Sequence, residues 1–231
     1  MIRFLVTALF VASLATSQAF AIQQPYTDLK TMQEKQQFVS EVGFRLLNAN
    51  KIKERTVFQF VNSKTVNAYS SHNNRNIVIY SGIMNYTTEE DEVAAILAHE
   101  ISHSIDSYHG ICRGYFSTLP YVFVPRKYER KADKRAVDFM VNAGYNPVAM
   151  IVMMNKIFPQ YRYEFLSSHP IVSRRMMYVY EYIYTKYPEY LKNNKYYNNI
   201  YYQNFLLTSQ DNRRKLQNKL EMNYKGNVKY D

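Results

Sequence analysis

The sequence predicts a mainly helical α+β domain, with a small antiparallel sheet beside one buried helix. Apolar residues recur with helical spacing through most of the chain, and three short β-prone runs separated by turn residues fall between the first two helices. The chain has 231 residues, of which 47% are hydrophobic and 21% charged. This composition is that of a globular protein, and this length suits one domain with a substantial core.

The first 21 residues have the features of an export signal. A basic start at Arg3 precedes an apolar run, and Ala19-Phe20-Ala21 has the small-x-small form that signal peptidase cleaves. The alternative is an uncleaved anchor, because Phe4 to Ile22 approaches the ~20 residues that cross a bilayer. We expect residues 1–21 to be a signal peptide and the mature chain to be exported, with the periplasm favoured over secretion or retention by an anchor.

Cysteine content and charge limit the possible partners. Cys112 is the single cysteine, so no intramolecular disulfide can form. The formal net charge is +10, but the basic residues are dispersed and no nucleic-acid-binding motif is present. We therefore expect no nucleic acid as a partner, and consider peripheral contact with a membrane or an anionic envelope surface the better explanation of the charge.

The N-terminal half of the mature chain is expected to form one helix and the sheet. The helix covers residues 28–48, with Asp28 as its N-cap. Its apolar side consists of Met32, Phe38, Val39, Val42 and Leu46. The β-prone runs that follow are Thr56–Val61, Val66–Tyr69 and Ile77–Tyr80.

A second helix is expected from about Thr88 to Tyr108, with Thr87 and Glu90 forming a capping box at its start. The later helices are expected over residues 128–142, 147–158, 172–184 and 204–222. We assign residues 22–190 to one domain and residues 191–231 to a helical C-terminal extension rich in Tyr, Asn and Lys.

The helix predicted from residue 88 carries the motif His99-Glu100-Ile101-Ser102-His103. Residues four apart are displaced by only about 40° around a helix, so both imidazoles face one direction and can bind one zinc ion. Glu100 is turned away from that direction, close enough to act on a water at the metal without binding the metal itself. The run before the motif, residues 93–98, is apolar all round, which favours a buried helix over one bearing two surface histidines.

A catalytic zinc needs a third protein ligand, for which two candidates compete. His109 lies six residues after His103, as in the HExxHxxGxxH pattern, but Asp106 stands where that pattern has glycine. Glu129 lies on a separate predicted helix with Asp133 one turn beyond, where Asp133 can accept the other N–H of a ligand histidine. Taken alone, these residues favour Glu129 and leave His109 open.

Four ordered motifs and an upstream element resemble the zinc peptidase family that includes HtpX, BepA, LoiP and the CAAX prenyl protease. They are the stretch Glu90–His103, Glu129-x-x-Ala132-Asp133, Ala143-Gly144-Tyr145-Asn146-Pro147, Ser168-His169-Pro170 with Arg175 beyond it, and Asn67-Ala68-Tyr69 upstream. The likeness is greatest to the small exported bacterial members, and it implies a gluzincin-type metallopeptidase domain. It also implies Glu129 as the third ligand, His169 near the active site as a possible oxyanion donor, and Arg175 as a supporting residue.

Together, the motif and the resemblance predict a metalloendopeptidase with one catalytic zinc ion, in which Glu100 moves the proton. We expect polypeptide substrates, in particular unfolded or misassembled proteins of the cell envelope. An extended substrate is expected along a sheet edge, at the Ile77–Tyr80 strand. The alternative is a zinc-stabilised periplasmic chaperone or binding module with little proteolytic activity, although such a module would not need Glu100.

Overall fold

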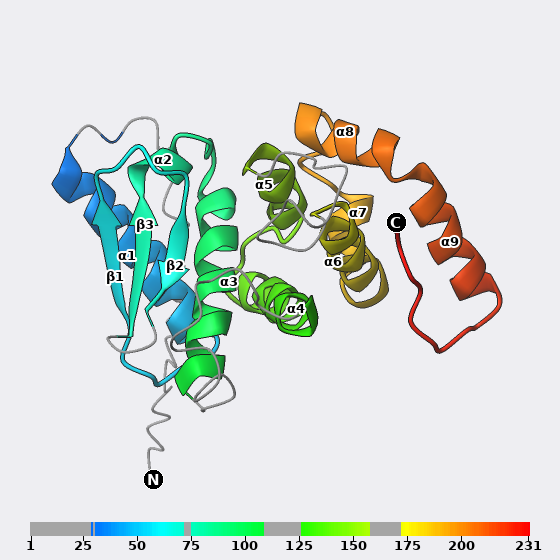
Figure 1. Cartoon of the computed structure of the whole chain (residues 1–231), viewed down its shortest axis with the longest axis horizontal. Coiled ribbons are helices and arrows are strands. Elements are labelled where there is room, and N and C mark those ends of the chain that lie inside the picture. The colour runs from blue at the N-terminus through cyan, green and yellow to red at the C-terminus, as the bar shows by residue number, and fades with distance from the viewer. Residues whose placement is uncertain (1–28, 30, 72–74, 109–125, 158–171) are drawn as a thin grey trace, which may run out of the picture.

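Helix α3 (Glu90–Tyr108) lies between a three-stranded sheet and a layer of helices (Figure 1). The computed structural model describes residues 29, 31–71, 75–108, 126–157 and 172–231. Within them the chain is mainly helical with one small sheet, so the predicted α+β class is confirmed. The predicted signal peptide, residues 1–21, lies outside the described residues.

The sheet is mixed, and the prediction of a wholly antiparallel sheet is wrong. Its strands are β1 (Val57–Val61), β2 (Ala68–Ser70) and β3 (Asn76–Tyr80), in the order β1-β3-β2. β3 runs parallel to β1 and antiparallel to β2. Ile77, Val78 and Ile79 are all buried, and an unbroken apolar run of this kind is typical of a strand covered on both faces rather than of an edge.

The position of β3 also corrects the expected substrate edge. Because β3 is paired on both sides, the Ile77–Tyr80 strand cannot accept an added strand. The edges of the sheet are β1, which packs on helix α1, and β2, which contacts α3. The edge next to the HExxH helix is therefore β2.

Helix α1 (Met32–Ala49) covers one face of the sheet and begins later than predicted. Thr31, not Asp28, is its N-cap: Glu34 N donates to Thr31 Oγ1 at 3.1 Å, and Thr31 N donates to Glu34 Oε2 at 2.8 Å. This reciprocal pair is a capping box. Met32 is 47% exposed and so does not belong to the core side, whereas Phe38, Val39, Val42 and Leu46 are buried as predicted.

The start of α3 is fixed by a buried acid rather than by the predicted capping box. The Glu92 carboxylate accepts from Thr88 N at 2.6 Å and pairs with Lys156 Nζ at 2.6 Å. Thr87 instead donates its hydroxyl to Met84 O, so Thr87 and Glu90 do not cap the helix together. Residues 93–98 are all buried, as their apolar character predicted, so the part of α3 that precedes the motif lies in the core.

The remaining helices form the layer on the other side of α3 (Figure 1). They are α4 (Arg126–Asn142), α5 (Ala149–Ile157), α6 (Val172–Lys186), α7 (Glu189–Lys192), α8 (Ile200–Thr208) and α9 (Gln210–Glu221), while the short α2 (Ser81–Met84) follows β3. The single helix predicted over residues 204–222 is two helices that meet at Ser209. Within the described part of the chain, no helix is both long and apolar enough to cross a membrane.

The close contact between α3 and α4 positions the motif. Ala132 and Ala136 of α4 are fully buried, and small side chains at a helix crossing let two backbones approach. At the end of α3, Asp106 Oδ1 accepts from Lys131 Nζ and Arg135 Nη2 of α4, each at 2.9 Å. Burial opposes the charge of Asp106, but these two cations outweigh it and hold the pKa of that carboxyl below its usual value.

Replacing Asp106 should weaken this helix pair. Because the pKa of Asp106 is lowered in the folded state, its stabilisation is present above the ordinary aspartate value of about 4 and is lost as the pH falls below it, through the lower folded-state pKa. We expect Asp106→Asn to reduce the free energy of unfolding by about 1–3 kcal/mol near pH 7 and to converge with the parent chain in acid. Denaturant unfolding across pH measures this, with exposed Asp211→Asn as the control. A pH-independent difference would contradict the prediction.

Candidate metal centre

The two histidines of the motif point their Nε2 atoms at one another from successive turns of α3. The Nε2 atoms of His99 and His103 lie 3.1 Å apart, and the rings meet edge to face. Their side chains are 17% and 19% exposed. The pair is therefore partly open to solvent, although the helix segment before it is buried.

Glu129 of α4 reaches the same point. Its Oε1 lies 3.2 Å from His103 Nε2, and its Oε2 lies 3.6 Å from His99 Nε2. Ligand atoms of a tetrahedral zinc site with bonds of 2.0–2.1 Å are about 3.3–3.4 Å apart. The observed separations are close to this spacing, so two imidazole nitrogens and one carboxylate are arranged as three ligands of one ion would be.

This donor set fits a divalent metal. One donor atom from each of the three residues falls within 4.8 Å of the others, and they form a potential metal-binding group among the described residues. Imidazole and carboxylate together suit zinc and several other transition metals. A fourth position, which these three residues leave to solvent, is what a catalytic site requires.

Arg175 of α6 connects the two carboxylates of α4. Its Nη1 lies 2.9 Å from Glu129 Oε2, and its Nε and Nη2 donate to the Asp133 carboxylate at 2.9 and 2.7 Å. Burial opposes ionisation of both acids, but Arg175 and the histidines outweigh it and lower the pKa of each. Both carboxylates are therefore kept charged, as a metal ligand and its support must be.

Asp133 lies behind His99. Its Oδ1 is 3.0 Å from His99 Nδ1, although the ring N–H is not aimed straight at it. A carboxylate at this position favours a proton on Nδ1 and leaves Nε2 as the free donor to a metal. The Asp133 side chain is 2% exposed, so water cannot readily replace it in this role.

Glu100 lies beside the group without belonging to it. Burial raises the pKa of Glu100 to about 7, and nearby Glu129 adds to the increase, while His103 and the backbone N–H of Ser70 oppose it. Ser70 belongs to the β2 edge, so that edge borders the motif. Sequence reasoning did not single out Ser70; its place next to Asn67-Ala68-Tyr69 was the available sign.

The structure brings together six of the residues that the sequence selected: His99, Glu100, His103, Glu129, Asp133 and Arg175. His169 lies outside the described residues, and so does His109, the competing third ligand. An HExxH helix that meets a carboxylate of the following helix, with a second acid beside it, defines the class of HExxH metallopeptidases.

Comparison with known proteins specifies this class further. Residues 33–121 and 113–183 match the model of peptidase family M48, so the match covers well over half of the chain. The chain is 26% identical over 181 residues to the Beta-barrel assembly-enhancing protease of Yersinia pestis, covering 61% of this chain and 37% of that protein. The protein of the same name from Escherichia coli K12 is 23% identical over the same shares.

This chain belongs to peptidase family M48, which implies a metal ion in the site. The resemblance deduced from the ordered motifs is thereby confirmed. The chain spans little more than a third of the length of these relatives, so the likeness says nothing of the rest of their length.

Removing Arg175 should destabilise the fold and loosen the metal centre. Arg175→Met leaves Glu129 and Asp133 buried without their counter-ion, which costs about 3–5 kcal/mol for a buried pair. We expect a lower free energy of unfolding and weaker zinc binding, by about 10- to 100-fold, because groups that support ligands tune affinity on this scale. Zinc titration with a competing chelator and denaturant unfolding measure the two effects. Arg214→Met, an exposed charge on α9, is the control, and unchanged zinc affinity in Arg175→Met would refute its supporting role.

Proposed function

We propose that this chain is a zinc-dependent metalloendopeptidase. The observation that supports it is the meeting of His99, His103 and Glu129 at separations suited to one tetrahedral ion, with Glu100 beside them. When bound, zinc would supply Lewis acidity, polarising a carbonyl oxygen and lowering the pKa of water. Glu100 would take a proton from the attacking water and deliver it to the leaving amine.

The other residues would hold this arrangement. Asp133 would keep the proton of His99 on Nδ1, and Arg175 would keep Glu129 and Asp133 ionised. His169 remains a proposed oxyanion donor on the strength of the family resemblance alone.

An extended substrate would pair with the β2 edge. Asn67 O and Ser71 N form hydrogen bonds with β3. In an antiparallel pair, alternate residues of a strand bond to the partner strand, so the backbone N–H and C=O groups of Ala68 and Ser70 point away from β3. The outward N–H of Ser70 bonds to Glu100, so a peptide on this edge would pass the proposed base. Backbone pairing of this kind tolerates many sequences and suits unfolded clients.

The clients we propose are unfolded or misassembled proteins of the cell envelope, met after export to the periplasm. The names of the relatives, which refer to β-barrel assembly, support this setting. The export-type N-terminus and the basic charge agree with it, and peripheral contact with an anionic membrane surface is part of the proposal. Residues 22–190 would form the catalytic domain, with residues 191–231 as its extension.

Glu100→Gln tests the mechanism. The substitution keeps size and removes the base, so the variant should still bind one zinc ion per chain while cleavage of an unfolded protein such as casein falls by at least about 10²–10⁴-fold. Metal analysis and a cleavage assay measure this, with chelator treatment of the parent chain as a second control.

The same variant distinguishes a peptidase from the alternative, a chaperone or binding module. A zinc-stabilised chaperone or binding module would suppress aggregation of an unfolded client equally well in the parent chain and in the Glu100→Gln variant, and would show no chelator-sensitive cleavage. Undiminished cleavage by the Glu100→Gln variant would refute the role of Glu100, and absence of zinc from the parent chain would refute the metal.

Ala68→Pro tests the substrate edge. Proline removes the outward N–H of residue 68 without touching the bonds from β2 to β3. One lost hydrogen bond should raise KM by about three- to tenfold with little change in kcat. Ala68→Ser keeps the N–H and is the matched control. Equal KM values for the two variants would indicate that substrate does not use this edge.

A further inference from the structure

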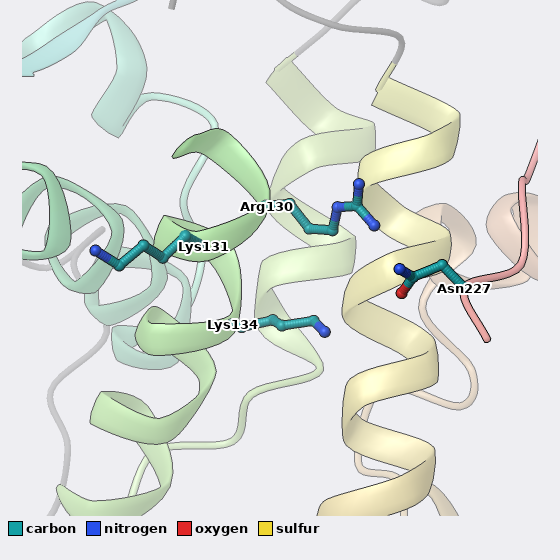
Figure 2. Close-up of a pocket in the computed structure, with 4 residues that line it drawn as sticks. All are labelled: Arg130, Lys131, Lys134 and Asn227. Atoms are coloured by element: carbon teal, nitrogen blue, oxygen red, sulfur yellow. The ribbon is translucent and has the colours of Figure 1, made fainter. Parts of the chain in front are cut away.

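An open hollow of about 370 Å³ lies on the side of α4 away from the HExxH helix, lined by Arg130, Lys131, Lys134 and Asn227. The polar ends of Arg130, Lys134 and Asn227 converge between α4 and α6, whereas Lys131 points away from them (Figure 2). Lys131 is already paired with Asp106. The hollow thus presents a guanidinium, an ammonium and an amide to one region.

Both cations are held in place by tyrosines of α6. The guanidinium carbon of Arg130 lies 4.2 Å from the ring centre of Tyr178, and Lys134 Nζ lies 5.3 Å from that of Tyr182. Arg130 and Lys134 are four residues apart on α4, and Tyr178 and Tyr182 are four residues apart on α6. The same cation–ring contact therefore occurs on two successive turns of both helices. Stacking restrains the long side chains and leaves their N–H groups able to donate, which lowers the ordering cost of binding a ligand.

These two cations have no carboxylate partner in an ion pair with the described part of the chain. Asp138, one turn beyond Lys134, is already engaged: it accepts from Lys186 at 2.8 Å and from Tyr187 at 2.8 Å, and also from Tyr182. Two partly exposed positive charges one helical turn apart repel each other, and an anion bound between them would relieve that repulsion.

We propose that this hollow is a phosphate-binding site. Arg130 offers a planar fork of donors, Lys134 an ammonium, and Asn227 an amide from a third direction. A tetrahedral phosphate has oxygens that can meet donors from all three, whereas a planar carboxylate is satisfied by the fork alone. The phosphate is that of a lipid headgroup or of a soluble molecule, since the recognition chemistry is shared. The site is separate from the metal centre and does not depend on peptidase activity.

The experiment uses the full chain, a double variant and a matched control. Arg130→Gln/Lys134→Gln removes both cations, and Lys53→Gln/Arg55→Gln removes the same charge from two exposed residues on the sheet side of the molecule. Circular dichroism and thermal unfolding verify folding, and Lys134→Gln alone serves if the double variant does not fold. The N-terminal apolar segment is the same in all chains, so any difference between variants reports on the hollow.

Binding of inorganic phosphate is measured by calorimetry, and binding of vesicles by flotation with phosphatidylglycerol in phosphatidylcholine against phosphatidylcholine alone. We expect the double variant to lose about tenfold or more in affinity, because each charge-assisted hydrogen bond contributes about that factor, and the control to stay within about twofold. Site-dependent binding of inorganic phosphate supports a soluble source, and site-dependent flotation without it supports a lipid headgroup.

Three results would overturn the proposal. The first is binding of neither probe by the parent chain. The second is an equal loss in the double variant and the control, which would mean that net charge alone acts. The third is site-dependent binding of polyglutamate with no such binding of phosphate or vesicles, which would assign the hollow to acidic polypeptides.

Discussion

The close packing of α4 against α3 is the contact on which the metal centre depends. Two alanines, Ala132 and Ala136, place only methyl groups on the buried side of α4, so the Glu129 carboxylate can reach the histidines of α3. A larger residue at either alanine would push the two helices apart. The Glu129 carboxylate would then lie too far from the histidine nitrogens to share a metal ion with them. On the side of α4 that meets α3, Glu129 reaches the histidines, while Lys131 and Arg135 bind Asp106 near the end of α3.

Charge balance explains why a cation belongs at this point. Two buried carboxylates, Glu129 and Asp133, face a single guanidinium, so the cluster keeps one net negative charge in a place shielded from water. Buried charge of this kind needs a partner. A divalent ion beside Glu129 supplies it, and the same ion would act against the protonation of Glu100 that burial and Glu129 now favour.

The parts of this structure that local patterns encode could be predicted from the sequence, whereas those that depend on distant partners could not. The burial of residues 93–98 follows from their unbroken apolar character, and the shared face of His99 and His103 follows from helical periodicity. The start of α3 could not be predicted in this way. Glu92 caps it while paired with Lys156 of α5, and a contact between distant residues leaves no sign in the local sequence. The strand order failed for a similar reason: turn residues suggested sequential hairpins, and only the unbroken run Ile77-Val78-Ile79 indicated the central place of β3. Arg175 was assigned from family resemblance, since nothing local to α6 indicates that it spans two acids of α4.

Helix α6 links the metal centre to the rest of the helical layer. It directs Arg175 inward to the acids of α4, and it directs Tyr178 and Tyr182 to the basic side chains of the hollow. The C-terminal residues hold α6 from behind: Tyr178 donates to Val228 O at 3.2 Å, and buried Tyr230 donates to Glu181 at 2.8 Å. The segment after residue 190 therefore contacts the same helix that carries Arg175. The C-terminal extension, expected from its composition to be polar, is thus packed against α6 and buries Tyr230.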